Sequence, residues 1–194
     1  MNMKRLIIAC TLVFSFSLCV VAQHMSFMGI PMGTHINTFK KSLLSKGFKT
    51  LQTNDAAPNI YCYNGGTFSG YRVTLNVQVT PRTKKVYSVY AVFTDFFYFK
   101  SGYNSIYGRG VSIKDITETF NSISKKLTQK YGECFPFTPD DPQFLKWNSW
   151  QSTGGDICLV IVNYNDDPNC VKMYIEYSDE STRRLNNHEE NDDL

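Results

Sequence analysis

The alternation of apolar and polar residues predicts long strands in both halves of the chain. Between residues 71 and 79 every second side chain is apolar and those between are polar, the pattern of a strand with one buried and one solvated face. Residues 171–177 repeat this alternation, and residues 86–93 form a further long strand after a turn. The run 157–164 is apolar on both faces, which predicts a strand in mid-sheet or covered twice. Shorter strands are expected at two further places, residues 60–63 and the stretch around Trp147 and Trp150.

Two segments carry the spacing of amphipathic helices instead. Residues 36–48 place large apolar side chains on one stripe, and Thr34 suits an N-cap because its hydroxyl can accept a bond from a free backbone N–H. Residues 113–131 form a longer stripe behind Ser112 and Asp115, which match a capping-box pair. Each helix is followed by strands, so the chain predicts the order helix then strands twice.

The two halves also resemble each other in detail. Residues 39–46 align with residues 123–130, so that two lysines, a leucine and a large apolar residue coincide. Glycine pairs at 65–66 and 154–155 each precede a long predicted strand. Self-similarity of this kind predicts a repeated architecture. We therefore expect an α+β fold of two tandem units, each a helix packed on one face of an antiparallel sheet of about three strands.

The start of the chain has the pattern of a secretory signal. Lys4 and Arg5 precede a nearly uninterrupted apolar run, and the small residues before position 23 suit cleavage after Ala22. A retained membrane helix is the alternative, but the run is shorter than the roughly 20 residues that span a bilayer. Cys19 lacks the small preceding residue of a lipid-attachment site. We expect an exported protein, periplasmic or extracellular, that is soluble after cleavage and not stably inserted in a membrane.

The rest of the chain divides at changes in pattern. A segment rich in Phe and Tyr interrupts the repeat between the two units, and the C-terminal residues are polar, acidic and expected to be disordered. The expected organisation is a signal peptide at 1–22, a first α+β unit at 23–93, an aromatic connection at 94–111, a second α+β unit at 112–180 and a polar acidic tail at 181–194.

Charge argues against a nucleic-acid partner. The chain has 20 Lys and Arg against 17 Asp and Glu, and loss of Lys4 and Arg5 leaves 18 against 17. The exported protein is thus close to neutral, without the clustered basic residues of nucleic-acid-binding proteins.

Four cysteines remain after cleavage: Cys62, Cys134, Cys158 and Cys170. An even count in an exported chain favours two disulfides, with three pairings to consider. Cys158 and Cys170 fall at opposite ends of a predicted hairpin, about 20 Å apart, whereas a bridge needs Cα atoms about 4.4–6.8 Å apart. Both remaining pairings join Cys62 to the second unit. Free, buried thiols are the alternative.

Motifs for catalysis, metals and cofactors are missing from the sequence. The three histidines are isolated, and neither His-Glu-x-x-His, Cys-x-x-Cys nor Gly-x-Ser-x-Gly occurs. Residues 163–167 have the oxygen spacing of the start of a calcium loop, but Pro168 and Tyr174 stand where that loop needs Gly and Glu, and a hairpin turn explains the same residues. We expect no enzyme, no metal and no cofactor; a hydrolase assembled in space around His35 is an alternative.

The wet face of the predicted sheet is the candidate binding surface. Tyr, Trp and Arg concentrate binding energy at protein interfaces, although large aromatic residues also fill cores. Thr74 and Gln78 fall on the same polar face as the candidates from strand 71–79. The candidate binding residues are Arg72, Asn76, Phe96, Phe97, Tyr98, Tyr103, Tyr107, Arg109, Trp147, Trp150 and Tyr174.

Several short motifs resemble a group of exported bacterial proteins that has no assigned activity. Residues 27–33 (FMGIPMG), then Phe39, Leu43 and residues 46–48 (KGF), carry this resemblance, and residues 127–132 extend it into the second unit. These motifs belong to the fold and span most of the exported chain. The doubled helix-plus-sheet unit is more distantly similar to β-lactamase inhibitor protein and to small outer-membrane assembly lipoproteins. That resemblance implies an open sheet whose uncovered face binds another protein.

The sequence therefore predicts an exported, non-enzymatic binding module for a protein or peptide of the cell envelope. The alternative is a small-ligand protein that captures a glycan or lipid fragment in a pocket between the units, with Trp147, Trp150 or tyrosines stacking on it.

Overall fold

One long antiparallel sheet organises the protein. The computed structural model describes residues 24–51, 57–96, 98–99, 112–137, 141, 143–164 and 167–191. Along the sheet the strand order is β3-β4-β5-β6-β11-β10-β9-β8, β7 pairs with one end of β11, and β1 and β2 form a separate small hairpin. The strands are β1 (Ser26–Phe27), β2 (Ile30–Pro31), β3 (Lys49–Thr50), β4 (Ile60–Phe68), β5 (Tyr71–Val79), β6 (Val86–Phe93), β7 (Tyr98–Phe99), β8 (Phe135–Phe137), β9 (Phe144–Ser152), β10 (Gly155–Tyr164) and β11 (Asp167–Asp179).

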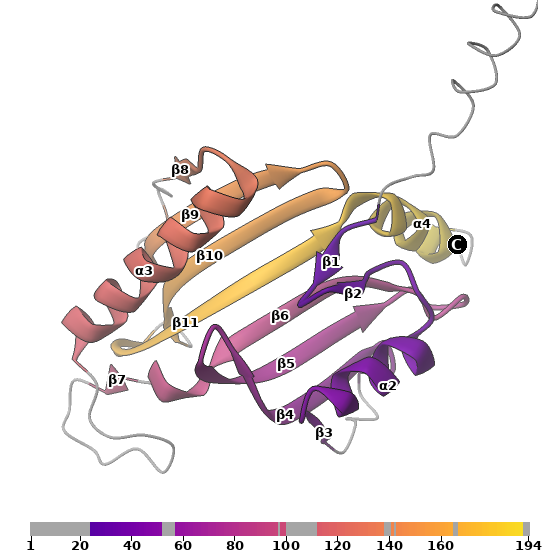
Figure 1. Ribbon diagram of the computed structural model, residues 1–194, viewed down its shortest axis with the longest axis horizontal. Coiled ribbons are helices and arrows are strands. Elements are labelled where there is room, and N and C mark those ends of the chain that lie inside the picture. The colour runs from indigo at the N-terminus through magenta and orange to yellow at the C-terminus, as the bar shows by residue number, and fades with distance from the viewer. Residues whose placement is uncertain are drawn as a thin grey trace, which may run out of the picture.

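The fold is α+β, as predicted, and its core lies on one face of this sheet. The helices are α2 (Ile36–Ser45), a 3-10 turn η1 (Thr94–Phe96), α3 (Ile113–Tyr131) and α4 (Glu180–Asn191). Figure 1 shows α2, α3 and the β1–β2 hairpin on the same side of the sheet. Their apolar side chains are buried there together with the odd-numbered residues of β5, so we call this side the helix face and the other side the open face. One cross-strand row of the helix face is wholly buried: Leu75, Ala91, Ile175 and Leu159.

The predicted long strands are confirmed, and two short ones are longer than expected. β10 lies in mid-sheet between β9 and β11, as the apolar residues on both its faces predicted. β4 continues through Gly65 and Gly66, past a register shift, so this glycine pair lies inside a strand and not before it. A Cβ on Gly66 would lie 2.5 Å from the ring of Phe48. Glycine is therefore needed here because the buried Phe48 packs directly on the backbone of β4.

The α3 cap is confirmed, whereas the N-cap expected for the first helix is wrong. Ser112 and Asp115 form a complete capping box at the start of α3. At α2 the N-cap is His35, whose Nδ1 accepts the backbone N–H of Asn37 at 3.2 Å. The hydroxyl of Thr34 instead donates to the carbonyl of Pro31 at 3.0 Å, because the tight β2–α2 connection turns it back toward the hairpin.

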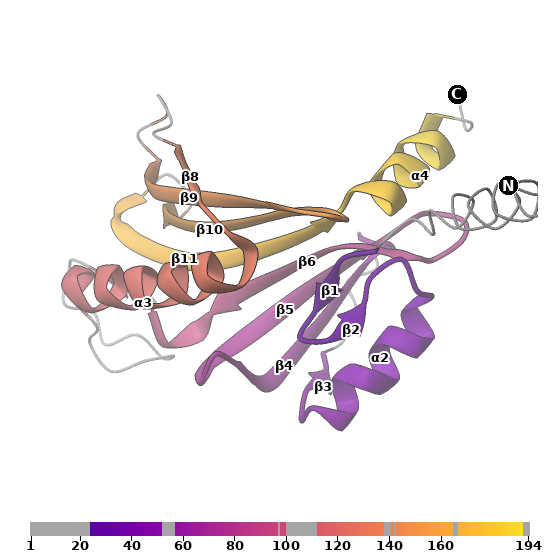
Figure 2. The same ribbon diagram turned by 45° about the horizontal axis from the view of Figure 1, so that its top comes forward.

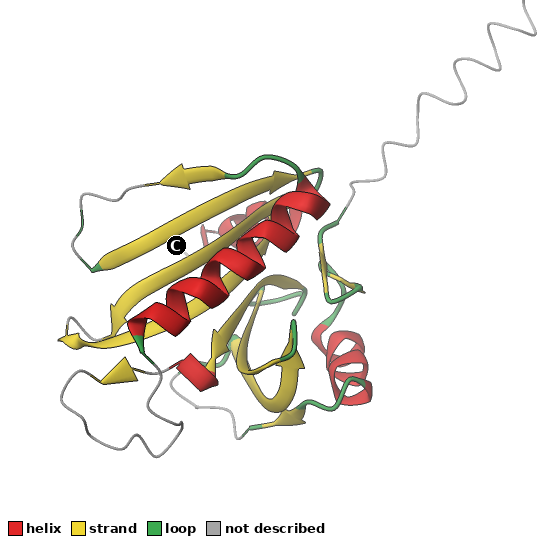
Figure 3. Cartoon of the chain, turned by 60° about the vertical axis from the view of Figure 1, so that its left-hand side comes forward, coloured by secondary structure: helices red, strands yellow, loops and turns green. Residues whose placement is uncertain are grey.

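The predicted disorder of the C-terminal tail is wrong, because residues 180–191 form α4. The buried stripe of this helix is polar, consisting of Thr182, Asn186 and Glu189. The Glu189 carboxylate accepts the backbone N–H of Arg82 at 2.7 Å and the hydroxyl of Thr83 at 2.6 Å in the β5–β6 turn. Figures 2 and 3 show α4 on the side of the sheet away from α3. Hydrogen bonds from polar side chains attach α4 to the sheet. A pattern of apolar residues therefore could not predict this helix.

The predicted disulfides are also wrong for the cysteines whose side chains are described. Cys62, Cys134 and Cys158 are free. Cys62 on β4 and Cys158 on β10 are separated by four strand spacings, about 19 Å. Cys134 packs against the core of the helix face, whereas Cys158 lies opposite Glu176 on the open face. None of these thiols can reach another without breaking the sheet.

The expected signal peptide, residues 1–22, lies outside the described residues. Within the part of the chain that is described, no helix has the length and apolar character needed to cross a bilayer. The strands of both sequence halves belong to a single sheet, because β6 of the first half pairs with β11 of the second. The strands of both halves therefore share one face opposite α2 and α3, and α4 packs against one end of that open face.

Candidate functional site

Two neighbouring rows of side chains cross the open face and together form the candidate site. Residues paired in register lie on the same face of a sheet, so the pairings place these side chains side by side. The first row is Phe135, Ser149, Cys158, Glu176, Tyr90, Asn76 and Cys62. The second row is Phe137, Trp147, Val160, Tyr174, Val92 and Thr74. Both rows change from aromatic at the β8 edge to polar at the β4 and β5 end.

The β8 end of the rows is an exposed aromatic cluster. Phe135 and Phe137 are 58% and 55% exposed. The ring of Trp147 lies 5.5 Å from that of Phe137 and 5.2 Å from that of Phe144, measured between centroids. We call these four residues the aromatic edge. Clustered exposed apolar rings are unusual on a soluble surface and mark interaction sites.

Val160 shows how closely the aromatic edge joins the middle of the face. This residue is on the open face, yet it is fully buried. Its neighbours in register are Trp147 on β9 and Tyr174 on β11, two large side chains that flank it on the same face. Trp147, Val160 and Tyr174 thus link β9 to β11 in one row.

A carboxylate lies at the centre of the face. The Ser88 hydroxyl donates to Oε1 of Glu176 at 3.1 Å, and the Tyr90 hydroxyl lies near the same carboxylate. Burial raises the pKa of Glu176 above its ordinary value, against the opposing effect of the Tyr90 and Ser88 hydroxyls. The rings of Tyr90 and Tyr174 lie 6.0 Å apart at 49°. We call Ser88, Tyr90, Tyr174 and Glu176 the tyrosine–glutamate centre.

The thiols of the open face are not activated for nucleophilic chemistry. Burial, with a smaller contribution from Glu176, raises the pKa of Cys158 to about 11. Burial likewise raises the pKa of Cys62, whose thiol donates to Oδ1 of Asn76 at 3.3 Å. A reactive cysteine needs a lowered pKa, and burial shifts both thiols the other way, toward the protonated form.

A serine, a histidine and an aspartate do meet where β11 joins α4, but in the wrong arrangement for catalysis. Nδ1 of His24 lies 3.1 Å from Oδ1 of Asp179 and 3.1 Å from the Ser181 hydroxyl. A catalytic triad places the serine and the aspartate on different ring nitrogens. Here both meet the same nitrogen, and the buried Asp179 also accepts the Thr182 N–H at 2.9 Å as the N-cap of α4. The group is a helix cap that fastens the N-terminal segment.

The structure brings three of the predicted site residues together on the open face. Asn76, Trp147 and Tyr174 belong to the two rows. Arg72 lies at the end of β5, where its Nε donates to Oδ1 of Asp95 at 2.7 Å. It is therefore the partner of a neighbouring acid at the rim of the face.

Two other predicted residues belong to the core. Phe96 is buried with its ring centroid 5.1 Å from that of Tyr71, and the fully buried Trp150 donates to the hydroxyl of Thr128 under α3. The side chains of Phe97, Tyr98, Tyr103, Tyr107 and Arg109 lie outside the described residues, although the backbone of Tyr98 is part of β7.

The prediction missed Tyr90, Glu176, Phe135 and Phe137. Alternation along residues 86–93 places Tyr90 on the same face as Ser88, and Glu176 alternates with buried neighbours. Only the pairing of β6 with β11 shows that these two residues are adjacent.

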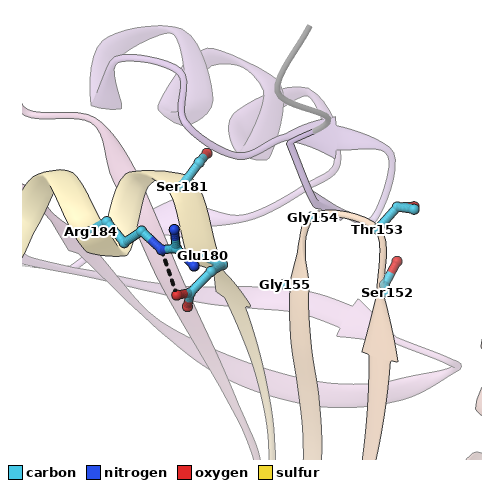
Figure 4. Close-up of a pocket in the computed structure, with 7 residues that line it drawn as sticks. All are labelled: Ser152, Thr153, Gly154, Gly155, Glu180, Ser181 and Arg184. Carbon is cyan, nitrogen blue, oxygen red and sulfur yellow. Dashed lines mark hydrogen bonds and ion pairs between the residues drawn. The ribbon is translucent and has the colours of Figure 1, made fainter. Parts of the chain in front are cut away.

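Two hollows lie on the described surface. The larger, of about 450 Å³, lies between the β9–β10 turn and the start of α4 (Figure 4), where Nε of Arg184 pairs with Oε1 of Glu180 at 2.9 Å. The smaller, of about 180 Å³, lies on the helix face.

The described residues contain no group of three or more His, Cys, Asp or Glu placed to hold a metal, and part of the calcium-like segment, residues 165–166, is not described.

No protein family, curated protein or solved structure matches the chain.

Proposed function

We propose that the protein is an exported, non-enzymatic binding module that takes a protein or peptide partner on the open face of its sheet. The single observation that carries this proposal is the aromatic edge, with Phe135 and Phe137 more than half exposed beside Trp147. Aromatic anchors beside hydrogen-bonding groups are what concentrates affinity in protein interfaces. The protonated thiols support a binding role over a nucleophilic one.

The proposal includes a doubled scaffold. One unit is α2 with β4, β5 and β6, and the other is α3 with β9, β10 and β11. The last strands of the two units pair with each other. Each helix covers the same side of the sheet, so two small open faces join into a wide one. The resemblance to proteins that bind partners on an open sheet agrees with this arrangement, as analogy only.

Phe137→Arg is expected to abolish capture of the partner from envelope extract, whereas Ile113→Arg leaves it unchanged. Both residues are about half exposed, at 55% and 44%, so neither change should unfold the protein. Phe137 belongs to the aromatic edge, whereas Ile113 lies at the start of α3. The measurement is chemical crosslinking of purified bait in extract, followed by mass spectrometry. Equal capture by both variants, or no captured protein with wild type, would exclude the open face as the binding surface.

A second candidate function is capture of a small amphiphile with an anionic head. The 180 Å³ hollow lies between α3 and the β4–β5 turn, on the border of the two proposed units. Its floor is apolar and aromatic, and two lysines lie on its α3 side: it is lined by Met28, Phe68, Ser69, Ile123, Lys126, Leu127, Lys130, Tyr131 and Tyr177. The sequence-based small-ligand alternative expected tryptophans or tyrosines to line the pocket. Tyr131 and Tyr177 line this hollow, whereas Trp147 and Trp150 do not.

Thermal unfolding with short-chain fatty acids tests this second candidate. A ligand at 100 times its Kd stabilises the folded state by about 2.7 kcal/mol, a Tm rise of about 5–10 °C for a chain of this size. Replacing Lys126 and Lys130 by alanine should remove the rise. If Tm does not move with any chain length, the hollow is not a fatty-acid site.

A further inference from the structure

We propose that the tyrosine–glutamate centre binds an arginine side chain of the partner, whose apolar residues rest on the aromatic edge. This inference rests on the proposed function of the open face and names the chemistry of the partner.

The first observation is that Glu176 is a partly buried carboxylate without a cation of its own. The neutral hydroxyl of Ser88 donates to it, and the neutral hydroxyl of Tyr90 lies nearby. Among the described side chains no ion pair includes Glu176. Arg183 on α4 is the nearby cation, and its guanidinium is bonded to Glu180, with Nε at 2.9 Å. A buried charge that lacks a partner is costly, and one that faces an open surface can be paired by a ligand.

The second observation is the free capacity of that carboxylate. An ionised carboxylate offers about four acceptor positions on its two oxygens. The Ser88 hydroxyl occupies one of them and the nearby Tyr90 hydroxyl can take a second, which leaves two. The planar fork of a guanidinium bonds a carboxylate through two parallel N–H groups, so it matches the remaining capacity better than a lysine ammonium does.

The third observation is the pair of rings beside the carboxylate. Tyr90 lies opposite Glu176 in register, and Tyr174 lies two residues along β11 on the same face. A cation within about 6 Å of a tyrosine ring is attracted by its face. Burial raises the pKa of Tyr174 to about 12, so its phenol is neutral at physiological pH and adds no competing charge. Two adjacent rings and a carboxylate form a site for a flat cation.

The row also sets a distance. Glu176, Cys158, Ser149 and Phe135 follow one another across β11, β10, β9 and β8. Three strand spacings of about 4.8 Å place the carboxylate about 14 Å from the aromatic edge. An extended segment rises about 3.3 Å per residue and shows every second side chain to one side, so residues four apart span this distance on the same side. The expected partner segment carries an arginine four residues from a large apolar residue.

The test is the binding of a short Gly/Ser peptide that carries one arginine and, four positions along, one phenylalanine. Binding is measured by isothermal calorimetry or by tryptophan fluorescence, to which Trp147 and the buried Trp150 both contribute. Matched peptides carry citrulline, the neutral isostere, in place of arginine, or alanine in place of phenylalanine. The test variant is Glu176→Gln. The control is Glu118→Gln, which removes the same charge from the exposed surface of α3, where Glu118 pairs with Lys114. Wild type and Glu118→Gln should bind the arginine peptide at least about tenfold more tightly than Glu176→Gln does, the scale of a charge-assisted hydrogen bond. The citrulline peptide should bind every protein equally weakly.

Stability separates a binding role for Glu176 from a structural one. The folded environment disfavours the charged form of this residue, so Glu176→Gln should unfold at the same or a higher temperature than wild type. The inference is overturned if citrulline binds wild type as tightly as arginine does, a result that needs no variant. It is also overturned if Glu176→Gln keeps wild-type affinity.

Partner capture distinguishes this inference from the proposed function. If Glu176→Gln captures the partner as wild type does and Phe137→Arg does not, the open face binds a partner but not through an arginine. If the wild-type protein captures nothing and binds no peptide, both proposals fail.

Discussion

Alanine at position 155 is expected to destabilise the protein by about 4 kcal/mol or more, a large share of the roughly 5–15 kcal/mol that keeps a typical domain folded. A Cβ built on Gly155 would lie 1.8 Å from the carbonyl oxygen of Ser178 and 2.9 Å from its carbonyl carbon. Both contacts are with backbone, so no side chain can move aside. Gly155 starts β10 and pairs with Asp179 at the end of β11. The substitution must therefore force the two strands apart at the point from which α4 begins.

Urea unfolding of the purified protein measures this effect, with Gly70→Ala as the control. Gly70 lies in the β4–β5 turn with φ +91°, and nothing lies within 4 Å of a Cβ there. Alanine at Gly70 adds only the strain of a left-handed residue, about 1–2 kcal/mol. If the two variants lose the same free energy of unfolding, close approach of β10 to β11 is not what requires glycine at 155.

These two glycines show which parts of the fold a sequence can reveal. Alternation along β5 predicted both its limits and its faces, because each residue needs only its neighbours to be interpreted. The capping box of α3 is likewise local. The glycine pair 154–155 marks the start of a strand in the sequence. Glycine is required at 155, however, because the backbone of Ser178, more than twenty positions away, packs against it. Contacts between distant strands leave no periodic trace in the sequence.

The candidate site divides along the same line. Trp147 and Trp150 are three residues apart on β9, and an odd spacing in a strand places side chains on opposite faces. The spacing alone therefore allows only one of the two tryptophans on the open face. Asn76 and Tyr174 were placed by simple alternation. Glu176 beside Tyr90 required the pairing of β6 with β11, which joins the two halves of the chain.

Edge strand β8 was missed for a different reason. It is three residues long, Phe135–Phe137, with a proline at its centre, and proline normally argues against a strand. Proline is tolerated at a sheet edge because its missing N–H can face away from the neighbouring strand. The same residue discourages a further strand from adding to this edge. The exposed phenylalanines beside it are therefore available to a partner that lies on the face, while edge-to-edge pairing is hindered.

Asp179→Asn is expected to lower the free energy of unfolding at pH 7 by about 2–3 kcal/mol, the scale of hydrogen bonds to a buried charged group. The carboxylate is fully buried and accepts bonds at both oxygens. Oδ1 takes the N–H and the hydroxyl of Thr182, at 2.9 and 2.7 Å, and Oδ2 takes the N–H of Met25 at 2.8 Å. An amide has only one oxygen, so its NH₂ must face a donor on one side. Either the cap of α4 or the tie to the N-terminal segment is then lost.

The pH dependence of this difference tests the charge itself. Burial opposes ionisation of Asp179, but the hydrogen bonds from Thr182, Met25 and His24 outweigh it and hold its pKa below the ordinary value of 3.8. A lowered folded-state pKa contributes stability that is fully present above the unfolded-state pKa and is lost as the pH falls through the folded-state pKa. The gap between wild type and Asp179→Asn, measured by urea unfolding, should therefore be constant from pH 7 to pH 5 and shrink below about pH 4.

Glu180→Gln, one residue along on the surface, is the control, and its effect should stay well under 1 kcal/mol because solvent screens the pairs with Arg183 and Arg184. A gap that does not change between pH 7 and pH 3 would mean that the shape of the side chain, and not its charge, fastens α4 beside the open face.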